Sequence, residues 1–241
     1  MNEILKIRNV FGITPTNTHQ SAGMDFYIPN INPDEHDLVT IKDAFVKSYN
    51  INVDEYCELL DIFEKKLTKA IFERHAYNIM HLYLALYSLQ LNFAKKRDVA
   101  QAVQIFINEY LCFDNNGTPG VTLQLNDTLL INSGIRVILP ESHAGIFFNK
   151  SGKGNQGYDV RACVVDEDYT GYVHLSVAMT KNYSYKCKEN TVYCGDKLTQ
   201  MVVLPVKHCN ILEVNDEHYN AMMKNSQRGD NSFGSSDVKH E

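Results

Sequence analysis

The chain lacks the cysteine spacing of a zinc site or a disulfide framework. No C-x-x-C pair occurs, and the pair His208-Cys209 has no second pair at ligand spacing, which argues against zinc. The N-terminus also shows no pattern of a secretory leader. We therefore expect reduced thiols and a cytoplasmic location, or the host cytoplasm if the chain is viral. The six cysteines are Cys57, Cys112, Cys163, Cys187, Cys194 and Cys209.

An excess of positive charge is also missing. Lys and Arg number 23 against 29 Asp and Glu, so the formal net charge is -6. This balance gives no chain-wide field that would attract nucleic acid or an acidic membrane surface. The most apolar stretch, residues 79–93, is interrupted by polar side chains and is shorter than the roughly 20 residues that span a bilayer. We expect no nucleic-acid or membrane partner, and a polyanionic substrate would need local cations or a metal.

The apolar period changes along the chain. Between residues 33 and 118 apolar side chains recur every three or four positions, which predicts helices. One run starts at Asn52 with Glu55 and continues to Ile71, a second spans residues 77–93, and a third opens at Asp98 with Gln101. From residue 119 short alternating runs follow one another at close intervals up to Val214, which is typical of an all-β barrel or sandwich. The predicted fold is mainly β with an inserted α-helical subdomain. We expect a barrel core at 1–32 and 119–223, a helical insertion at 33–118 and a flexible arm at 224–241.

One stretch places carboxylates and an aromatic ring together. An apolar run from Val160 to Val165 leads into Asp166, Asp168 and Tyr169, and a second alternating run begins after Gly171. The pattern predicts a β-hairpin with an acidic tip. An ordinary solvated turn has a similar composition, so this stretch alone does not decide between a catalytic tip and a turn.

Four further stretches accompany this hairpin. They are SAGMDF at 21–26, NKSG at 149–152, GDKLTQM at 195–201 and RGDNSFGSS at 228–236. In this order, the five stretches resemble the five motifs of the trimeric dUTPases, the deoxyuridine 5'-triphosphate nucleotidohydrolases. The resemblance covers about residues 1–32 and 119–236. It implies a jelly-roll β-barrel, a homotrimer, and Mg2+-assisted hydrolysis of dUTP to dUMP and pyrophosphate by in-line attack on the α-phosphate.

The resemblance also implies roles for single residues. Asp166 would orient and activate the attacking water, Asp25 would meet Mg2+ through water, and the Tyr169 ring would pack on the deoxyribose. A carboxylate is a weak base, so alignment of the water must contribute more than basicity. The backbone at 158–163 would read uracil, and Phe233 would stack on the base. The expected substrate-binding residues are Lys150, Ser151, Gly152, Tyr158, Cys163, Tyr169, Gln200, Arg228, Phe233, Ser235 and Ser236.

The motifs depart from the family pattern at three places. Asn149-Lys150 stands where the family has Pro-Arg, Cys163 stands at a position that is often glycine, and Asn231-Ser232 replaces a doubled glycine. Lysine keeps the positive charge of arginine but loses the planar fork that makes bidentate contacts. These departures put the phosphate grip, the pocket wall and the flexibility of the arm in question.

Two other functions stay open at this point. A deoxycytidine triphosphate deaminase shares the same fold and would need a general acid/base near the hairpin, for which Glu167 is the candidate. A regulatory protein is the second alternative, because the long apolar insertion carries no chemical motif. In that case the insertion would bind a protein partner and the nucleotide site would act as a sensor.

Overall fold

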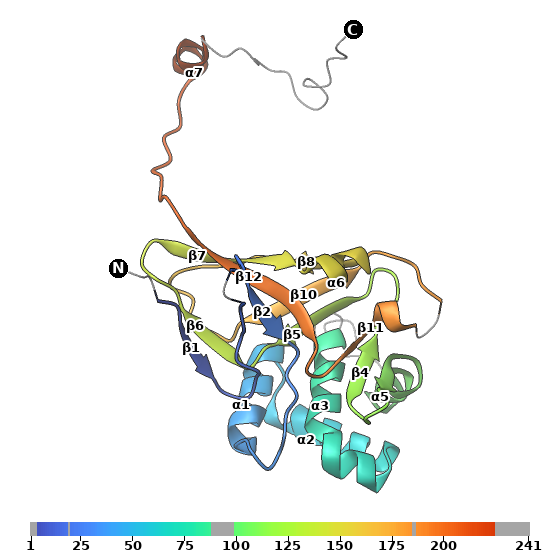
Figure 1. Cartoon of the computed structure of the whole chain (residues 1–241). Coiled ribbons are helices and arrows are strands. Elements are labelled where there is room, and N and C mark those ends of the chain that lie inside the picture. Colours follow the sequence, from blue (N-terminus) through green and yellow to red (C-terminus); the bar gives the residue numbers. More distant parts are fainter. Residues whose placement is uncertain (1–3, 19, 88–98, 185–186, 225–241) are drawn as a thin grey trace. The chain divides into compact units, whose positions relative to one another are not determined.

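The computed structural model describes residues 4–18, 20–87, 99–184 and 187–224 (Figure 1). Contacts divide the chain into two units, Met1–Val206 and Lys207–Glu241. The helical elements are α1 Leu38–Tyr49, α2 Val53–Lys66, α3 Lys69–Tyr87, α5 Val99–Ile105, a π-helical turn Phe106–Tyr110, α6 Ser151–Asn155, a 3-10 turn Lys188–Asn190 and α7 Asp216–Met223. None of the described helices is long and apolar enough to cross a membrane.

The strands of the first unit form four small sheets. Their orders are β1-β6, β5-β10-β8, β11-β4-β3 and β2-β12-β7-β9, and all their pairs are antiparallel. The strands are β1 Lys6–Asn9, β2 Met24–Tyr27, β3 Leu111–Phe113, β4 Pro119–Thr122, β5 Thr128–Asn132, β6 Ile135–Ile138, β7 His143–Asn149, β8 Tyr158–Arg161, β9 Val164–Val165, β10 His174–Met179, β11 Thr191–Tyr193 and β12 Lys197–Pro205.

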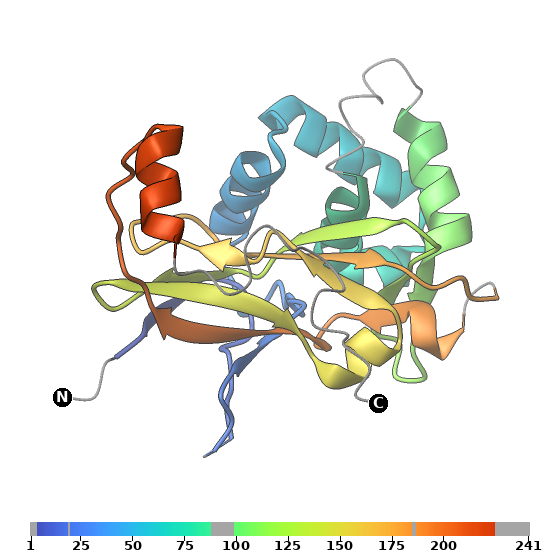
Figure 2. The same ribbon diagram turned by 90° about the horizontal axis from the view of Figure 1, so that it is seen from above.

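The helices between β2 and β3 gather on one side of the strands (Figures 1 and 2). Two of them start at side-chain caps. Asp37 accepts hydrogen bonds from the first turn of α1, and Asn52 and Glu55 form a reciprocal capping box at 2.8 Å on α2. Helix α3 is buried on nearly all sides from Asn78 to Leu86 and packs against β4 and β5. The predicted mainly β fold with a helical insertion is confirmed.

The predicted helix start at Asn52 is correct, but the run that follows it is not one helix. Leu67 has extended backbone angles, so α2 ends at Lys66 and a new helix begins at Lys69. The predicted third helical run corresponds to α5 and the π-helical turn after it. Helix α1 carries its own cap at Asp37 and had not been located individually.

The expectation of a single strand over 160–165 is wrong. Ala162 adopts a left-handed backbone conformation, with φ of 50°, and separates β8 from β9. Strand β8 pairs with β10, as expected for a hairpin, but β9 pairs with β7 in another sheet. The acidic segment 166–171 therefore follows a strand that has crossed to the sheet containing β2 and β12.

Two other boundaries also differ from expectation. Strand β12 ends at Pro205, and the predicted strand pattern up to Val214 is wrong, because residues 207–215 form no strand and α7 follows, capped by Asn215. The turn cluster at 114–118 joins β3 to β4 as a hairpin. Strand β3 of the predicted insertion thus pairs with β4 of the predicted barrel, and the division of the chain at residues 32 and 118 stays a prediction.

Candidate active site

Asp25 lies on β2 between two lysines. Lys197 is the first residue of β12, and its ammonium donates to Oδ2 of Asp25 at 2.9 Å. Lys150 is the residue after β7, and its ammonium donates to Oδ1. Burial acts to raise the pKa of Asp25, but the hydrogen bonds and charges of the two lysines outweigh it and hold this pKa below its usual value. Asp25 is therefore an ionised carboxylate whose two oxygens both accept N–H donors.

Gln200 lies beside this cluster. It pairs with Asp25 across β12 and β2, and its side-chain amide donates to the Asn149 carbonyl at 2.9 Å. Ser151 and Gly152 form the first turn of the short helix α6, and no heavy atom lies close to the place where a Cβ of Gly152 would point. The fold thus brings together the predicted residues Asp25, Lys150, Ser151, Gly152 and Gln200.

Asn149, one of the departures from the family pattern, has a structural contact. Its side-chain oxygen accepts a hydrogen bond from the backbone N–H of Val160 at 2.8 Å. This contact fastens the end of β7 to β8. A proline at this position has no side-chain acceptor, so the asparagine provides a connection that the family sequence pattern does not.

Tyr158 and Cys163 flank the chain segment expected to read uracil. Tyr158 is buried, its hydroxyl has no partner among the described residues, and the Lys153 ammonium lies 5.2 Å from its ring centroid. Burial lowers the pKa of Lys153, whereas Asp196, 3.5 Å away, works to raise it. Cys163 is half-buried, and its carbonyl accepts from the Phe147 N–H at 2.7 Å. The Tyr158 side chain is therefore part of the hydrophobic core and is not exposed to a ligand at the surface.

Asp166 and Tyr169 lie in the exposed segment after β9. The Tyr169 N–H donates to the Asp166 carbonyl at 3.1 Å, and the Tyr169 hydroxyl donates to the Tyr172 carbonyl at 2.8 Å. A Cβ on Gly171 would lie 2.5 Å from the Tyr169 hydroxyl oxygen, so glycine is needed for this close approach. The segment is a folded turn that presents the Asp166 carboxylate to solvent.

Arg136, on β6, supports the same segment and was not identified from the sequence. Its Nε donates to the Thr170 carbonyl at 2.8 Å, and its guanidinium lies 5.7 Å from the Tyr172 ring centroid. An arginine in an alternating strand gives no sequence signal for this contact. The candidate for a deaminase acid/base, Glu167, accepts from the Ser142 N–H at 2.7 Å, which is a structural contact.

The two groups of predicted residues lie far apart within one chain. In the sheet β2-β12-β7-β9, Phe148 of β7 pairs with Gln200, whereas Gly145 of β7 pairs with Val165. Asp166 follows Val165 and so lies level with position 144 of β7, whereas Asp25 lies level with Phe148. The two aspartates are thus separated by four positions along the strands and by three strand spacings across the sheet. At about 3.4 Å per residue and 4.8 Å per strand, the separation is roughly 20 Å. One chain does not bring Asp166 next to Asp25.

Some expectations concern residues outside this description. Arg228, Phe233, Ser235 and Ser236 lie beyond residue 224, outside the described residues. Across residues 4–18, 20–87, 99–184 and 187–224, no group of three or more His, Cys, Asp or Glu side chains could hold a metal ion.

A family model matches the C-terminal part of the chain. The family model described as dUTPase matches residues 112–237, which is more than half of the chain. The chain belongs to the dUTPase family. The match spans the hairpin segment, Gln200 and the C-terminal motif, and it leaves Asp25 and the helices α1, α2, α3 and α5 outside.

Curated relatives of this dUTPase-family chain come from viruses, bacteria and phages. The Pol polyprotein of equine infectious anemia virus is 29% identical over 118 residues, which are 49% of this chain and 9% of that polyprotein. The deoxyuridine 5'-triphosphate nucleotidohydrolase of variola virus is 27% identical over 130 residues, 54% of this chain and 77% of the relative. The corresponding protein of Escherichia phage T5 is 28% identical over 114 residues, 46% of this chain and 70% of the relative.

Solved structures of similar fold include a dUTPase. The dUTPase of Staphylococcus bacteriophage 80alpha, in a structure with dUpNHpp, aligns with a TM-score of 0.52 and 13% identity. The alignment covers 98% of this chain and 100% of that chain. At this identity the likeness shows the fold alone, and it supports the dUTPase-type jelly-roll barrel expected from the motifs.

Proposed function

We propose that the protein hydrolyses dUTP to dUMP and pyrophosphate at sites shared between subunits of a homotrimer. The observation that carries the proposal is the cluster of Lys150, Lys197 and Gln200 around the ionised Asp25, in a chain of the dUTPase family with net charge -6. An acidic protein needs such local donors to hold a substrate with several negative charges. The segment with Asp166 and Tyr169 would supply the other half of the site.

The proposed chemistry assigns the water to Asp166. Its carboxylate is exposed at the end of β9 and would accept a proton from a water aligned with the α-phosphate. The bond formed joins the water oxygen to the α-phosphorus, and the bond broken joins this phosphorus to the α,β-bridging oxygen, which leaves with pyrophosphate. Tyr169, with 41% of its surface exposed and its hydroxyl bonded to Tyr172, would pack its ring on the deoxyribose and exclude a 2'-hydroxyl.

The triphosphate would be held by the cluster around Asp25. Lys150 and Lys197 would exchange their contacts with Asp25 for phosphate oxygens, and the Ser151 hydroxyl, the Gly152 N–H and the Gln200 amide would donate to the chain. Asp25 fits Mg2+ through coordinated water, because both of its oxygens already accept donors of the kind that such a water presents. When bound, Mg2+ would neutralise part of the phosphate charge.

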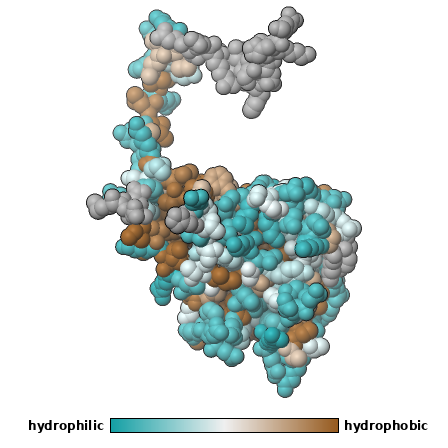
Figure 3. All heavy atoms as spheres, in the orientation of Figure 1, coloured by the Kyte–Doolittle hydropathy of each residue, from teal (hydrophilic) through white to brown (hydrophobic). Residues whose placement is uncertain are grey.

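Two observations support a site shared between subunits, and the number of three comes from the family resemblance. The roughly 20 Å between Asp25 and Asp166 is too long for one nucleotide-binding site within one chain, whereas a second subunit could bring its Asp166 to the cluster. Apolar side chains are also exposed on these strands, at Phe148, Val164 and Leu204, and Figure 3 shows apolar atoms gathered where β7 and β12 lie. In the assembly, Arg228, Phe233, Ser235 and Ser236 of the C-terminal arm would close over the base and phosphates.

A substrate panel with product identification tests the reaction. The purified protein with Mg2+ is expected to release pyrophosphate from dUTP. It should leave three analogues largely intact: UTP, which has a 2'-hydroxyl, TTP, which has thymine, and dCTP, which has cytosine. Formation of dUTP and ammonia from dCTP would instead establish deamination. Tight dUTP binding without any turnover would favour the sensor function, in which the helical insertion binds a protein partner.

A further inference from the structure

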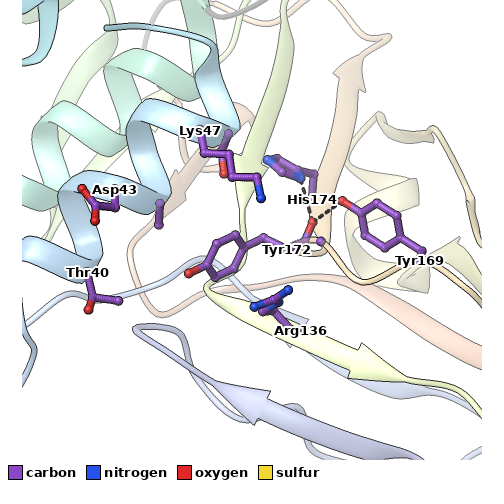
Figure 4. Close-up of a pocket in the computed structure, with 10 residues that line it drawn as sticks. Thr40, Asp43, Lys47, Arg136, Tyr169, Tyr172 and His174 are labelled. Carbon is purple, nitrogen blue, oxygen red and sulfur yellow. Dashed lines mark hydrogen bonds between the residues drawn. The ribbon is translucent and has the colours of Figure 1, made fainter. Parts of the chain in front are cut away.

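A pocket lies between the helical insertion and the segment that follows Asp166. Its volume is about 370 Å³, at the lower end of the range for small-molecule sites, which is roughly 300–1,000 Å³. One wall is the polar face of α1, where Thr40, Asp43, Lys47 and Ser48 share a side of the helix. The opposite wall consists of Arg136, Tyr169, Gly171, Tyr172 and His174 (Figure 4).

The charges of this pocket are not balanced within it. Lys47 and Arg136 come from different elements and flank Tyr172 (Figure 4). Among the described residues neither has a carboxylate within ion-pair distance, and Asp43, one turn before Lys47, makes no ion pair with it. Two cations and one carboxylate leave a net positive charge, although the whole chain carries -6. Such a pocket favours an anion.

The remaining polar groups define what else a ligand would meet. Arg136 already donates from Nε and Nη2 to the Thr170 carbonyl, so Nη1 is the nitrogen left for a ligand. The Tyr172 carbonyl accepts from both the Tyr169 hydroxyl and His174 Nδ1, at 2.8 Å and 2.9 Å. The ring of Tyr172 offers an apolar face beneath the guanidinium. A ligand would thus find one strongly cationic end, an aromatic surface and the Asp43 carboxylate, which accepts hydrogen bonds from hydroxyl groups.

We infer that this pocket is a second binding site, for a small phosphate monoester that carries hydroxyl groups. The phosphate lies between Lys47 and Arg136, and a hydroxyl group donates to Asp43. The site is formed by α1 of the insertion together with residues of the barrel. It differs from the proposed dUTP site, because none of the residues expected to hold the uracil or the triphosphate belongs to α1. The Tyr169 side chain is shared, because it belongs both to this pocket and to the segment that carries Asp166.

Calorimetric titration of the intact protein with ribose 5-phosphate tests the site. This probe has no base, so it lacks the group that the proposed uracil site would recognise, and ribose serves as the uncharged control. Binding at one site per chain is expected in the millimolar range or tighter. Lys47→Ala is expected to weaken it roughly tenfold or more, the usual effect of losing a charged hydrogen bond. Asp43→Asn removes a negative charge near the phosphate and keeps an oxygen that accepts from a hydroxyl group. The dissociation constant of ribose 5-phosphate is therefore expected to fall roughly two- to fivefold.

Matched controls make the outcomes decisive. Lys65 is an exposed lysine on α2, outside the pocket, and Lys65→Ala is expected to bind like the parent. Lys47 is itself exposed, so its replacement leaves the core intact. Absence of binding to the parent, or equal binding by the parent and Lys47→Ala, would overturn the inference. Equal binding of ribose would also overturn it, since the phosphate would then be irrelevant.

An effect on turnover is a consequence that rests on the proposed function. A ligand on Arg136 competes with the Thr170 carbonyl and touches Tyr169, so ribose 5-phosphate is expected to change the kcat of dUTP hydrolysis in the parent but not in Lys47→Ala. The two proposals fail separately. Binding without any dUTP hydrolysis would refute the proposed function and retain the site, whereas hydrolysis without binding would refute the site.

Discussion

Mixed trimers test whether Asp25 and Asp166 act across subunits. Two variants are prepared, Asp166→Asn and Asp25→Asn, each of which removes one carboxylate and keeps the side-chain shape. Because the two carboxylates lie roughly 20 Å apart in one chain, each site of the assembly would take Asp166 from one subunit and Asp25 from its neighbour. A trimer that contains both variants can then hold a site in which both native carboxylates are present.

The expected recovery follows from random assembly. When equal amounts of the variants are unfolded, mixed and refolded, a site is intact if its Asp166 comes from an Asp25→Asn chain and its Asp25 from an Asp166→Asn chain. Each condition holds for half of the chains, so about 25% of the sites are restored. Pyrophosphate release per chain is expected to rise from near zero to about a quarter of the parent rate.

The control samples are each variant refolded alone, with the mass of the assembly measured by light scattering. Neither control should recover activity. If the mixture forms trimers but stays as inactive as the separate variants, then the two carboxylates act within one chain, and the assignment of the site to a subunit boundary is wrong. Assembly as a monomer would contradict the same reasoning before any rate is measured, and assembly as a dimer would contradict the proposed trimer.

Three further predictions concern the insertion and the Asp166 segment. Asn52→Ala removes the capping box of α2 and is expected to lower the free energy of unfolding by about 1 kcal/mol, measured by urea denaturation. Gly171→Ala places a methyl group 2.5 Å from the Tyr169 hydroxyl oxygen, so kcat/KM for dUTP is expected to fall roughly 10- to 100-fold with the fold retained. Burial, helped by nearby His174, lowers the pKa of His81 to about 3, so this histidine stays neutral in the folded protein. The stability it contributes is complete above about pH 6.5 and is lost as the pH falls toward 3, by up to about 1.4 kcal/mol per pH unit, and His81→Phe is expected to reduce that slope in urea titrations.

Each of these predictions has its own refutation. Lys65→Ala serves as the comparison for Asn52→Ala, and an equal loss in both would show that the cap contributes nothing. An unchanged kcat/KM in Gly171→Ala would separate the position of the Tyr169 ring from catalysis. A parent and a His81→Phe variant with identical pH dependence of unfolding would remove His81 from the acid response.

The helical insertion shows which local features a sequence reveals. The capping box at Asn52 and Glu55 depends on residues three positions apart, and the structure contains it as predicted. The break at Leu67 contains no glycine or proline, and α3 begins two residues later. The apolar spacing is not interrupted there, so it predicts one continuous helix. Helix α3 packs against β4 and β5, and contacts of this kind are not local in the sequence.

The site shows the same limit at longer range. The motif residues could be identified from their order, but the crossing of the chain at Ala162, which moves β9 to the sheet of β7, has no signal in the run from Val160 to Val165. The Lys150 and Lys197 contacts with Asp25 join three separate segments. Arg136 likewise reaches the Asp166 segment from another sheet. Such contacts depend on strand order, which spacing does not determine.

The most direct test of the central claim is the rate of pyrophosphate release from dUTP by the parent and by Asp166→Asn, measured side by side with Mg2+. We expect the parent to hydrolyse dUTP and the variant to lose roughly 100- to 10,000-fold in kcat, the usual contribution of a positioned general base. The variant should retain nucleotide binding, because the cluster around Asp25 is unchanged. Equal rates in the two proteins would contradict the assignment of Asp166, and no release by the parent would contradict the proposed hydrolysis itself.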